Sequence, residues 1–244
     1  MIIIYDFDGT LTPYSLPQYE ILHRFGYTDE PLRKRLDEET EKDSSLGLYD
    51  AYYKCYKDIL SENGIPMNKE TVSLGADKVK LNNGVIDYFE KFKKSKTGIK
   101  HFIITSGIRE YVTRTEIAKY VDEIYGVTFK EVDGLYQDID MLVTDEKKVD
   151  IIKEIQRGQK RNEKIIYFGD GITDEYAFEY IHSQGGKNVF IAVDPKSRKV
   201  FDELNQKRLI DECFGADFGN DSKLASFVED LLMDEIMMGG RMPY

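Results

Sequence analysis

The sequence predicts an α/β fold of three layers, in which a parallel sheet lies between two layers of helices and a helical subdomain follows the first strand. Short apolar runs without polar alternation are typical of strands that are buried on both faces. The chain has four such runs: Ile2–Tyr5, Phe102–Thr105, Ile165–Phe168 and Val189–Val193. The segment between the first two runs is far longer than a βαβ crossover needs and is helical in character, which predicts the insertion.

We place the inserted helical subdomain at residues 13–80 and the core at residues 1–12 and 81–244. Helices are expected at Glu20–Phe25, Pro31–Glu41 and Leu46–Leu60, and the last ends at a breaking segment, residues 61–66. This last helix carries tyrosines at the spacing of one helical face: Tyr49, Tyr52, Tyr53 and Tyr56. Such a stripe is typical of a small helical core, and the alternative is that it roofs a substrate pocket.

The rest of the chain predicts more helices and one hairpin. The helices are expected at Val85–Phe92, Glu110–Tyr120, Lys147–Gln156, Thr173–His182 and Ser222–Met233. A hairpin is expected over Tyr125–Gln137, because Asp133-Gly134 is a favoured pair for a tight turn. The tail after the last helix, residues 239–244, is expected to be loose.

The composition limits the partners of the protein. The chain of 244 residues carries a formal net charge of -11, which argues against non-specific binding to nucleic acid or anionic lipid. An anionic substrate therefore needs a locally positive pocket or a metal ion. The apolar N-terminus is too short for a signal peptide or a membrane span, so we expect a cytoplasmic protein. Cys55 and Cys213 lack metal or redox spacing and are expected to be reduced packing residues.

Polar residues follow three of the predicted strands and are expected to meet in one crevice, since open α/β sheets bind ligands beyond the carboxyl ends of their strands. Asp6 and Asp8 follow the first run, Ser106 the second, and Asp170 and Asp174 the third. Carboxylates gathered in one place repel one another unless protons or a cation neutralise them. Oxygen ligands without paired histidine or cysteine favour Mg²⁺. The fourth run ends at Asp194-Pro195, which we expect to form a neighbouring loop.

Two more residues suit phosphoryl transfer. Lys148 begins a predicted helix and supplies a positive charge. Ser106, with the amides that follow it at a predicted helix start, is placed to donate hydrogen bonds to phosphate oxygens. A carboxylate nucleophile, a metal, a lysine and a hydroxyl donor together describe phosphoryl transfer.

These motifs resemble the signatures of the haloacid dehalogenase (HAD) superfamily of phosphatases. They occur in the family order and nearly span the chain: D-x-D-G-T at residues 6–10, Ser106 after its strand, a lysine at a helix start, and G-D-G-x-x-D at residues 169–174. The resemblance implies a three-layer Rossmann-like core. The insertion resembles the helical cap of the phosphoserine phosphatase-like branch, and the hairpin also has a counterpart there.

The resemblance implies a chemical role for each loop residue. Asp6 would be the nucleophile that becomes an aspartyl-phosphate. Asp8 would protonate the leaving alcohol and then activate water, and Thr10 would help orient it. Ser106 and the Gly107 amide would hold the phosphoryl oxygens.

The resemblance also implies a magnesium site. Mg²⁺ would lie on the Asp6 carboxylate, the Asp8 backbone carbonyl and Asp170. Asp174 would complete the shell, through water or by holding the lysine. Family members carry apolar residues three, four and seven positions after that lysine; counting from Lys148 gives isoleucine each time, whereas counting from Lys147 does not. Lys148 is therefore the predicted active-site lysine.

The sequence departs from phosphoserine phosphatases where those enzymes bind the charged ends of the amino acid. Ser15 replaces a glutamate, Tyr56 stands where a loose alignment puts an arginine, and Ile108 replaces a second glycine after the serine. The predicted function is therefore magnesium-dependent hydrolysis of a small phosphorylated metabolite other than phosphoserine. The alternatives are a phosphomutase or phosphotransferase with the same site, and a ligand-binding protein without catalysis. Asp8 and Asp170 argue against a dehalogenase.

Overall fold

A computed structural model of the protein describes residues 1–14, 16–17, 19–94, 98–159, 163–193, 195 and 197–239. Ser15, Asp194 and the tail beyond residue 239, about which the sequence made predictions, lie outside these described residues. Within them, no helix combines the length and the apolar character that crossing a membrane requires.

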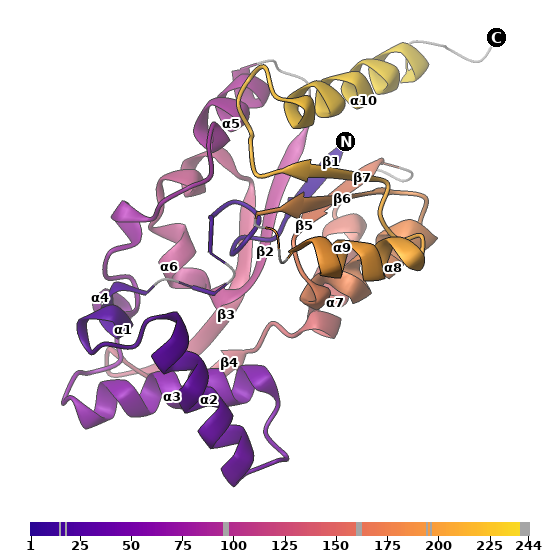
Figure 1. The fold of residues 1–244 in the computed structure, drawn as a ribbon. Coiled ribbons are helices and arrows are strands. Elements are labelled where there is room, and N and C mark those ends of the chain that lie inside the picture. The colour runs from indigo at the N-terminus through magenta and orange to yellow at the C-terminus, as the bar shows by residue number, and fades with distance from the viewer. Residues whose placement is uncertain are drawn as a thin grey trace.

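A seven-stranded sheet forms the centre of the fold, in the order β4-β3-β2-β1-β5-β6-β7 (Figure 1). All neighbouring strands pair in parallel except β3 and β4, which pair antiparallel. The strands are β1 (Ile2–Tyr5), β2 (Lys100–Ile108), β3 (Glu123–Val132), β4 (Leu135–Met141), β5 (Ile165–Gly169), β6 (Lys187–Ala192) and β7 (Glu212–Gly215). The predicted α/β class with a parallel sheet is confirmed.

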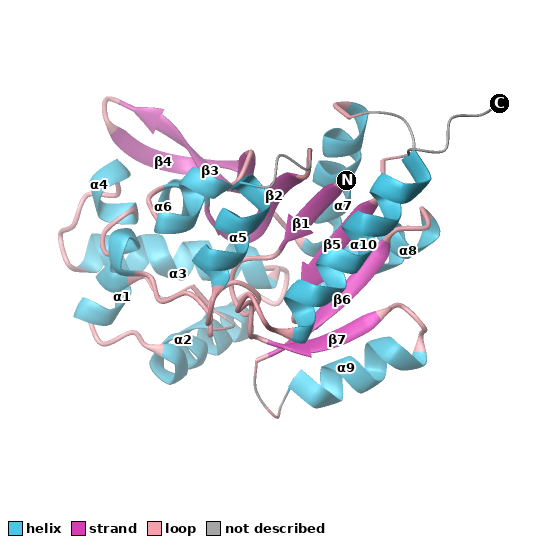
Figure 2. Cartoon of the chain, turned by 90° about the horizontal axis from the view of Figure 1, so that it is seen from above, coloured by secondary structure: helices cyan, strands magenta, loops and turns pink. Residues whose placement is uncertain are grey.

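Helices cover both faces of the sheet and create two apolar cores (Figure 2). On one face α5 (Val85–Lys94) and α10 (Lys223–Gly239) pack against the odd side chains of β1, among them Ile3 and Tyr5. On the other face Ile2 and Ile4 pack with α7 (Asp145–Arg157), α8 (Glu175–Ser183) and α9 (Ser197–Gln206). Because successive side chains of a strand point to opposite faces, a short apolar run without alternation serves both cores.

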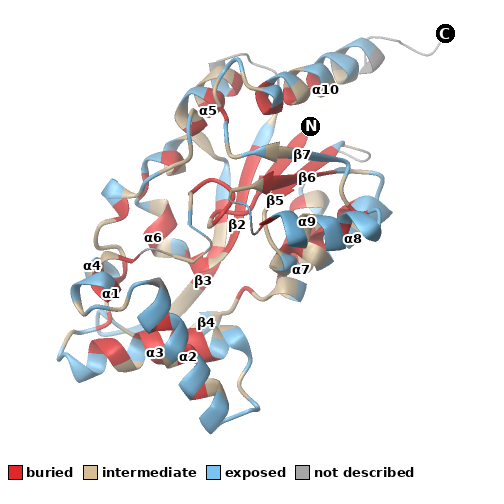
Figure 3. Ribbon diagram, viewed as in Figure 1, coloured by how far each residue is buried: buried red, intermediate tan, exposed pale blue. Residues whose placement is uncertain are grey.

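The inserted helices lie beyond the carboxyl end of β1 and beside β3 and β4 (Figure 1). They are α1 (Glu20–Arg24), α2 (Asp29–Lys42), α3 (Leu48–Glu62), α4 (Lys69–Val72) and a 3₁₀ turn at Ala76–Lys78. Their apolar side chains belong to the same core as α7 and α8. Tyr52, Tyr53 and Tyr56 are buried within it, and the buried stripe along α3 is visible in Figure 3.

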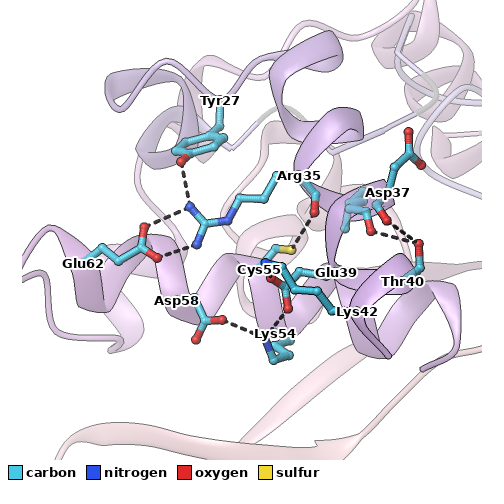
Figure 4. A network of polar contacts seen from close by, with 11 residues as sticks. Tyr27, Arg35, Asp37, Glu39, Thr40, Lys42, Lys54, Cys55, Asp58 and Glu62 are labelled. Carbon is cyan, nitrogen blue, oxygen red and sulfur yellow. Dashed lines mark hydrogen bonds and ion pairs between the residues drawn. The ribbon is translucent and has the colours of Figure 1, made fainter. Parts of the chain in front are cut away.

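Ion pairs on the outer side of the insertion hold α2 against α3 (Figure 4). Arg35 donates to the Glu62 carboxylate at 2.6 and 2.9 Å and to the Tyr27 hydroxyl at 2.7 Å. Glu39 accepts hydrogen bonds from both Lys42 and Lys54. The Arg35–Glu62 and Lys54–Glu39 pairs join α2 to α3, so these contacts serve the packing of the two helices.

The structure corrects several predicted elements. The helix expected over Glu110–Tyr120 is a short helix, α6 (Arg109–Thr113), followed by a 3₁₀ turn at Glu116–Tyr120. The Thr115 hydroxyl donates to the Val112 carbonyl at 2.7 Å, and such a local hydrogen bond competes with helix continuation. α9 and β7 were not predicted, and Cys213 is exposed rather than packed.

The expected hairpin is longer than predicted and belongs to the sheet. It spans β3 and β4, and β3 also pairs in parallel with β2. The turn lies at the predicted position, since Asp133 and Gly134 both have positive φ, 51° and 78°. β2 continues through residue 108, with a register shift against β3 between Ile104 and Ile108. Ser106 is therefore part of an irregular strand and does not begin a helix, contrary to the prediction.

Candidate active site

The ends of two neighbouring strands bring Asp6 and Asp170 together. β1 and β5 pair in register from Ile2 with Ile165 to Tyr5 with Phe168. The Asp6 amide then donates to the Phe168 carbonyl at 2.8 Å, which extends the pairing by one residue. Carboxylate oxygens of Asp6, Asp170 and Asp174 lie within 4.8 Å of one another. The predicted meeting of the first and third motifs is thus present in the structure.

Lys148 reaches this cluster from the first turn of α7. Its Nζ lies 2.9 Å from Asp6 Oδ1 and 2.7 Å from Asp174 Oδ1, and the side chain is 2% exposed. Lys147 is 42% exposed and pairs with Asp150. Thr144 caps the start of the helix by accepting the Lys147 amide on its hydroxyl, and Lys148 lies on the buried side of α7.

Asp174 is held by four groups of the protein. Besides Lys148, the Tyr167 hydroxyl donates to its Oδ1 at 2.6 Å. The amides of Asp170 and Gly171 donate to its Oδ2 at 3.2 and 3.3 Å. Both oxygens are therefore engaged, so Asp174 positions the lysine and the loop of residues 169–171. The sequence left this choice open, and Tyr167 was not among the predicted site residues.

Asp170 packs tightly against the first loop. Thr10 Oγ1 donates to Asp170 Oδ1 at 3.2 Å, so Thr10 orients Asp170 and not Asp8 as predicted. Gly9 has a φ of +87°, and a Cβ there would lie 2.1 Å from Asp170 Oδ2. The glycine of D-x-D-G-T is thus required both by the backbone conformation and by the close approach of the second carboxylate.

Asp8 is positioned by Thr105, a residue that the sequence predicted only as the end of a strand. Thr105 Oγ1 donates to Asp8 Oδ2 at 3.3 Å and accepts the Gly107 amide at 2.8 Å. The Gly107 amide, which was predicted to hold a phosphoryl oxygen, is therefore occupied by Thr105 here. Thr105 is buried. A threonine directly before the Ser-Gly pair was the only signal in the sequence for this contact.

Ser106 is fixed through its backbone and leaves its hydroxyl available. The Tyr53 hydroxyl donates to the Ser106 carbonyl at 2.6 Å. The Ser106 Oγ is buried and has no hydrogen-bond partner among the described residues. A buried hydroxyl without a partner is costly, which is consistent with a ligand atom completing its hydrogen bonding.

Burial raises the pKa of both carboxyl groups of the first loop. The pKa of Asp6 is raised to about 7 by burial, against the opposing effect of Lys148. The pKa of Asp8 is raised to about 8 by burial and by the charge of Asp6. Burial lowers the pKa of Lys148, but Asp174 and Asp6 outweigh it and raise the pKa well above its usual value. Near neutral pH, Asp8 is therefore mainly protonated and Lys148 is charged.

A cavity of about 160 Å³ opens over these residues. Its floor includes Asp6, Asp8, Ser106 and Lys148, and its roof comes from α2 and α3. Tyr49 and Tyr52 line it, whereas Tyr53 and Tyr56 do not. Both interpretations of the tyrosine stripe thus apply: Tyr52, Tyr53 and Tyr56 are buried in the helical core, and Tyr49 and Tyr52 also roof the cavity.

The donor set fits a hard divalent cation. Asp6 and Asp170 present carboxylate oxygens in the cluster, and no histidine or cysteine belongs to this group of ligand atoms among the described residues. Burial, and to a lesser extent the charge of Asp6, raise the pKa of Asp170 well above its usual value. A cation there would offset this repulsion. Because Asp174 is already engaged, Asp6 and Asp170 are the better placed direct ligands.

Comparison with known proteins identifies the family. The model of the haloacid dehalogenase-like hydrolases matches residues 3–179, and the chain belongs to this family. A protein of Borreliella burgdorferi, itself uncharacterized, is 26% identical over 56% of this chain. That alignment spans 62% of the Borreliella protein.

Solved structures share the fold at low sequence identity. A phosphoserine phosphatase in its apo form is 17% identical, with a TM-score of 0.62, and the match covers 93% of this chain and 97% of that one. A HAD family hydrolase from Salmonella enterica serovar Typhi is 19% identical, with a TM-score of 0.64, over 91% of this chain and 72% of that one. A phosphoserine phosphohydrolase-like protein from Francisella tularensis is 18% identical, with a TM-score of 0.59, and the match covers 93% of this chain and 98% of that one. These similarities concern the fold.

Gly9 gives a first test of the packing between the two loops. We expect Gly9→Ala to lower the free energy of unfolding by at least about 1 kcal/mol more than Gly134→Ala, because added atoms in a packed site force neighbours to shift. Gly134 is a matched control, since its φ is +78° and a Cβ there would meet nothing within 4 Å. Urea unfolding measures both variants, and equal losses would contradict the close approach of Asp170.

Proposed function

We propose that the protein is a magnesium-dependent phosphohydrolase that cleaves a small phosphate monoester through an aspartyl-phosphate on Asp6. The observation that carries the proposal is the buried arrangement of Asp6, Lys148 and Asp174, with Lys148 Nζ 2.9 Å from Asp6 Oδ1. This contact holds one Asp6 oxygen and leaves the other for attack on phosphorus. Asp8, Ser106 and Lys148 line the same cavity, where a phosphoryl group would be bound.

The first half of the reaction transfers the phosphoryl group to Asp6. An oxygen of Asp6 forms a bond to phosphorus while the bond from phosphorus to the leaving oxygen breaks. Asp8, whose pKa is about 8, gives its proton to the leaving oxygen. Lys148 and the free Ser106 hydroxyl are placed to stabilise the phosphoryl oxygens.

The second half restores the protein. Asp8, now a carboxylate, takes a proton from a water molecule as the water oxygen attacks phosphorus. The bond between phosphorus and Asp6 breaks, and inorganic phosphate leaves. We propose that the inserted helices act as a cap that excludes bulk water and selects the leaving group, since Tyr49 and Tyr52 of α3 roof the cavity.

Asp6 and Asp170 would hold the magnesium ion, together with the Asp8 backbone carbonyl. When bound, the ion neutralises charge on the phosphoryl oxygens and favours the ionised form of the Asp6 carboxyl group. The proposed need for a cation is consistent with the carboxylate oxygens gathered in one place and with the raised pKa values of Asp6 and Asp170.

Phosphate release from a panel of small phosphate monoesters, measured with Mg²⁺ and after chelation, tests the proposal. We expect release that requires Mg²⁺ and is saturable in at least one ester. Consumption of ester without free phosphate, with the phosphoryl group found on an added sugar or alcohol, would instead identify a transferase. Binding of Mg²⁺ and ester with neither outcome would identify a non-catalytic protein.

The raised pKa values of Asp6 and Asp8 predict how the stability of the protein depends on pH. The folded-state pKa of Asp6 is raised from 3.8 to about 7 and that of Asp8 from 3.8 to about 8. A carboxyl group with a raised folded-state pKa adds stability below its unfolded pKa, and this stability is lost as pH rises through the folded-state value. We therefore expect the melting temperature of the chelated protein to fall between about pH 5 and pH 8.5.

Saturating Mg²⁺ should reverse much of this loss, by about 2–3 kcal/mol at a hundred times its dissociation constant. The stabilisation should be larger near pH 8 than near pH 5.5, where protons compete for the ligands. Differential scanning calorimetry measures both effects. Asp170→Asn is expected to remove the response to Mg²⁺, and a response equal to that of the native protein would exclude Asp170 as a ligand.

A further inference from the structure

The walls of the cavity above Asp6 differ strongly from its floor. The floor carries the carboxylates, Lys148 and the Ser106 hydroxyl. The walls are mainly apolar or aromatic, from Leu16, Pro17, Leu36, Leu48 and the two tyrosines. Leu48 is 59% exposed although it is a large apolar residue. Such walls favour a leaving group with an apolar body. The volume of about 160 Å³, part of which the phosphoryl group would fill, limits that body to no more than about one ring, since a cavity of similar size holds benzene.

Arg33 is the one cation in the wall of this cavity among the described residues. Lys148, on the floor, is neutralised by Asp6 and Asp174. Arg33 has no ion pair or hydrogen bond within the described part of the chain, and it is exposed. Its neighbour Arg35, two residues along the helix, is engaged by Glu62 and Tyr27 through both terminal nitrogens (Figure 4). Arg33 is thus available to a ligand, whereas Arg35 is not.

Tyr52 provides a second, independent sign of a ligand. It is 7% exposed, lines the cavity, and its buried hydroxyl has no hydrogen-bond partner among the described residues. Burying a hydroxyl without a partner costs free energy, so the native protein gains from a bound group that accepts its proton. Arg33 comes from α2 and Tyr52 from α3, so both helices of the roof contribute a polar side chain to the lining of the cavity.

The described walls of the cavity have no carboxylate that could pair with an ammonium group on a ligand. The carboxylates among its described lining residues are Asp6 and Asp8, both on the floor where the phosphoryl group would be bound. A positively charged leaving group would therefore face Arg33 without an acidic partner. In a protein of net charge -11, an available cation at the cavity wall also attracts anions.

We propose that Arg33, assisted by the Tyr52 hydroxyl, determines specificity for phosphate monoesters whose leaving group has an apolar body of about one ring and a second, distal anionic group. This inference rests on the proposed phosphohydrolase function and adds the class of substrate. The guanidinium donates two parallel hydrogen bonds to an anion, a geometry that suits a carboxylate or a second phosphate equally. Both of these groups share the chemistry that the cavity recognises.

Matched aryl esters test the inference. Phenyl phosphate is compared with 4-carboxyphenyl phosphate, with 1,4-phenylene bisphosphate and with 4-(aminomethyl)phenyl phosphate. For each, kcat/KM is divided by the value for phenyl phosphate, and this ratio is followed across variants so that leaving-group reactivity cancels. We expect Arg33→Gln to lower the ratio of at least one anionic ester by about tenfold, the effect of one lost charge-assisted hydrogen bond.

Lys34→Gln is the matched control, because it removes the same charge from the next residue of α2, which does not line this cavity. Its ratios should equal those of the native protein. The aminomethyl ester should gain relative to phenyl phosphate in Arg33→Gln. If neither anionic ratio changes in Arg33→Gln, or if Lys34→Gln changes them equally, the assignment of Arg33 is wrong.

Tyr52→Phe separates a ligand-binding hydroxyl from a structural one. Removing a hydroxyl that has no partner in the free protein should leave the melting temperature unchanged or raise it, while KM for the preferred ester increases. A lower melting temperature with unchanged KM would overturn the role of Tyr52.

Calorimetric binding in an Asp6→Asn background distinguishes this inference from the proposed function. The anionic ester should bind more tightly than phenyl phosphate, and adding Arg33→Gln should remove the difference. If the native protein hydrolyses no ester but this contrast persists, the hydrolase proposal fails and the binding inference stands. If hydrolysis occurs without the contrast, the inference fails alone.

Discussion

Asp6→Asn will lose phosphate release by at least about ten-thousand-fold, the scale seen when a nucleophile is removed. The variant keeps the size and shape of the side chain but replaces the attacking carboxylate oxygen by an amide. No other described carboxylate is held by Lys148 at the floor of the cavity with an oxygen left for phosphorus, since both oxygens of Asp174 accept hydrogen bonds. Rapid acid quenching with a radiolabelled ester should leave label on the native protein and none on the variant.

The Asp6→Asn variant should lose activity but remain folded. Because burial raises the pKa of Asp6 to about 7, its charged form is disfavoured in the metal-free protein, and the amide should leave the melting temperature unchanged or higher. Asp150→Asn, at a position 64% exposed on α7, is the control and should keep full activity. Full turnover by Asp6→Asn would exclude the covalent route.

Lys148→Met will both inactivate and destabilise the protein. The lysine is buried and lies 2.9 Å from Asp6 and 2.7 Å from Asp174. Its removal leaves two buried carboxyl groups without their counter-ion, a change that costs about 3–5 kcal/mol when one partner of a buried pair is lost. Urea unfolding near pH 8 measures the loss. Phosphate release should fall in parallel, because Asp6 loses the contact that orients it.

The pH dependence of this loss identifies its cause. Without the ammonium group the folded-state pKa of Asp6 should rise above its present value of about 7. Asp6 is then protonated over a wider range, so the deficit should be smaller near pH 5.5 and grow as pH rises towards 8. Lys147→Met is the matched control, since Lys147 is 42% exposed and pairs only with Asp150. A deficit that does not vary with pH would indicate lost packing instead of an uncompensated charge.

The active-site lysine illustrates what the spacing of apolar residues in the sequence can predict. The apolar residues after Lys148 are the buried face of α7, namely Ile151, Ile152 and Ile155. A residue three, four or seven positions before them shares that face. The sequence could therefore distinguish Lys148 from Lys147, although it could not show which carboxylates the ammonium would meet.

Contacts between side chains of distant segments could not be predicted from the sequence. Thr10 was predicted to orient Asp8 but donates to Asp170, because the first loop turns sharply at Gly9 against the loop after β5. Thr105, which lies within the irregular stretch of β2, takes the place beside Asp8. No periodicity records where a hydroxyl points within an irregular strand.

The amino-acid sequence by itself determined the class of fold, the order of the motifs and the side chains that gather at the strand ends. It could do so because strands buried on both faces need continuous apolar runs, and because parallel strands bring the loops at their carboxyl ends to one edge of the sheet. Only the tertiary structure decided which partner each polar group has, which tyrosines face the cavity, and that Arg33 is available where Arg35 is paired. These outcomes depend on packing between segments far apart in the chain, and local sequence does not encode that geometry.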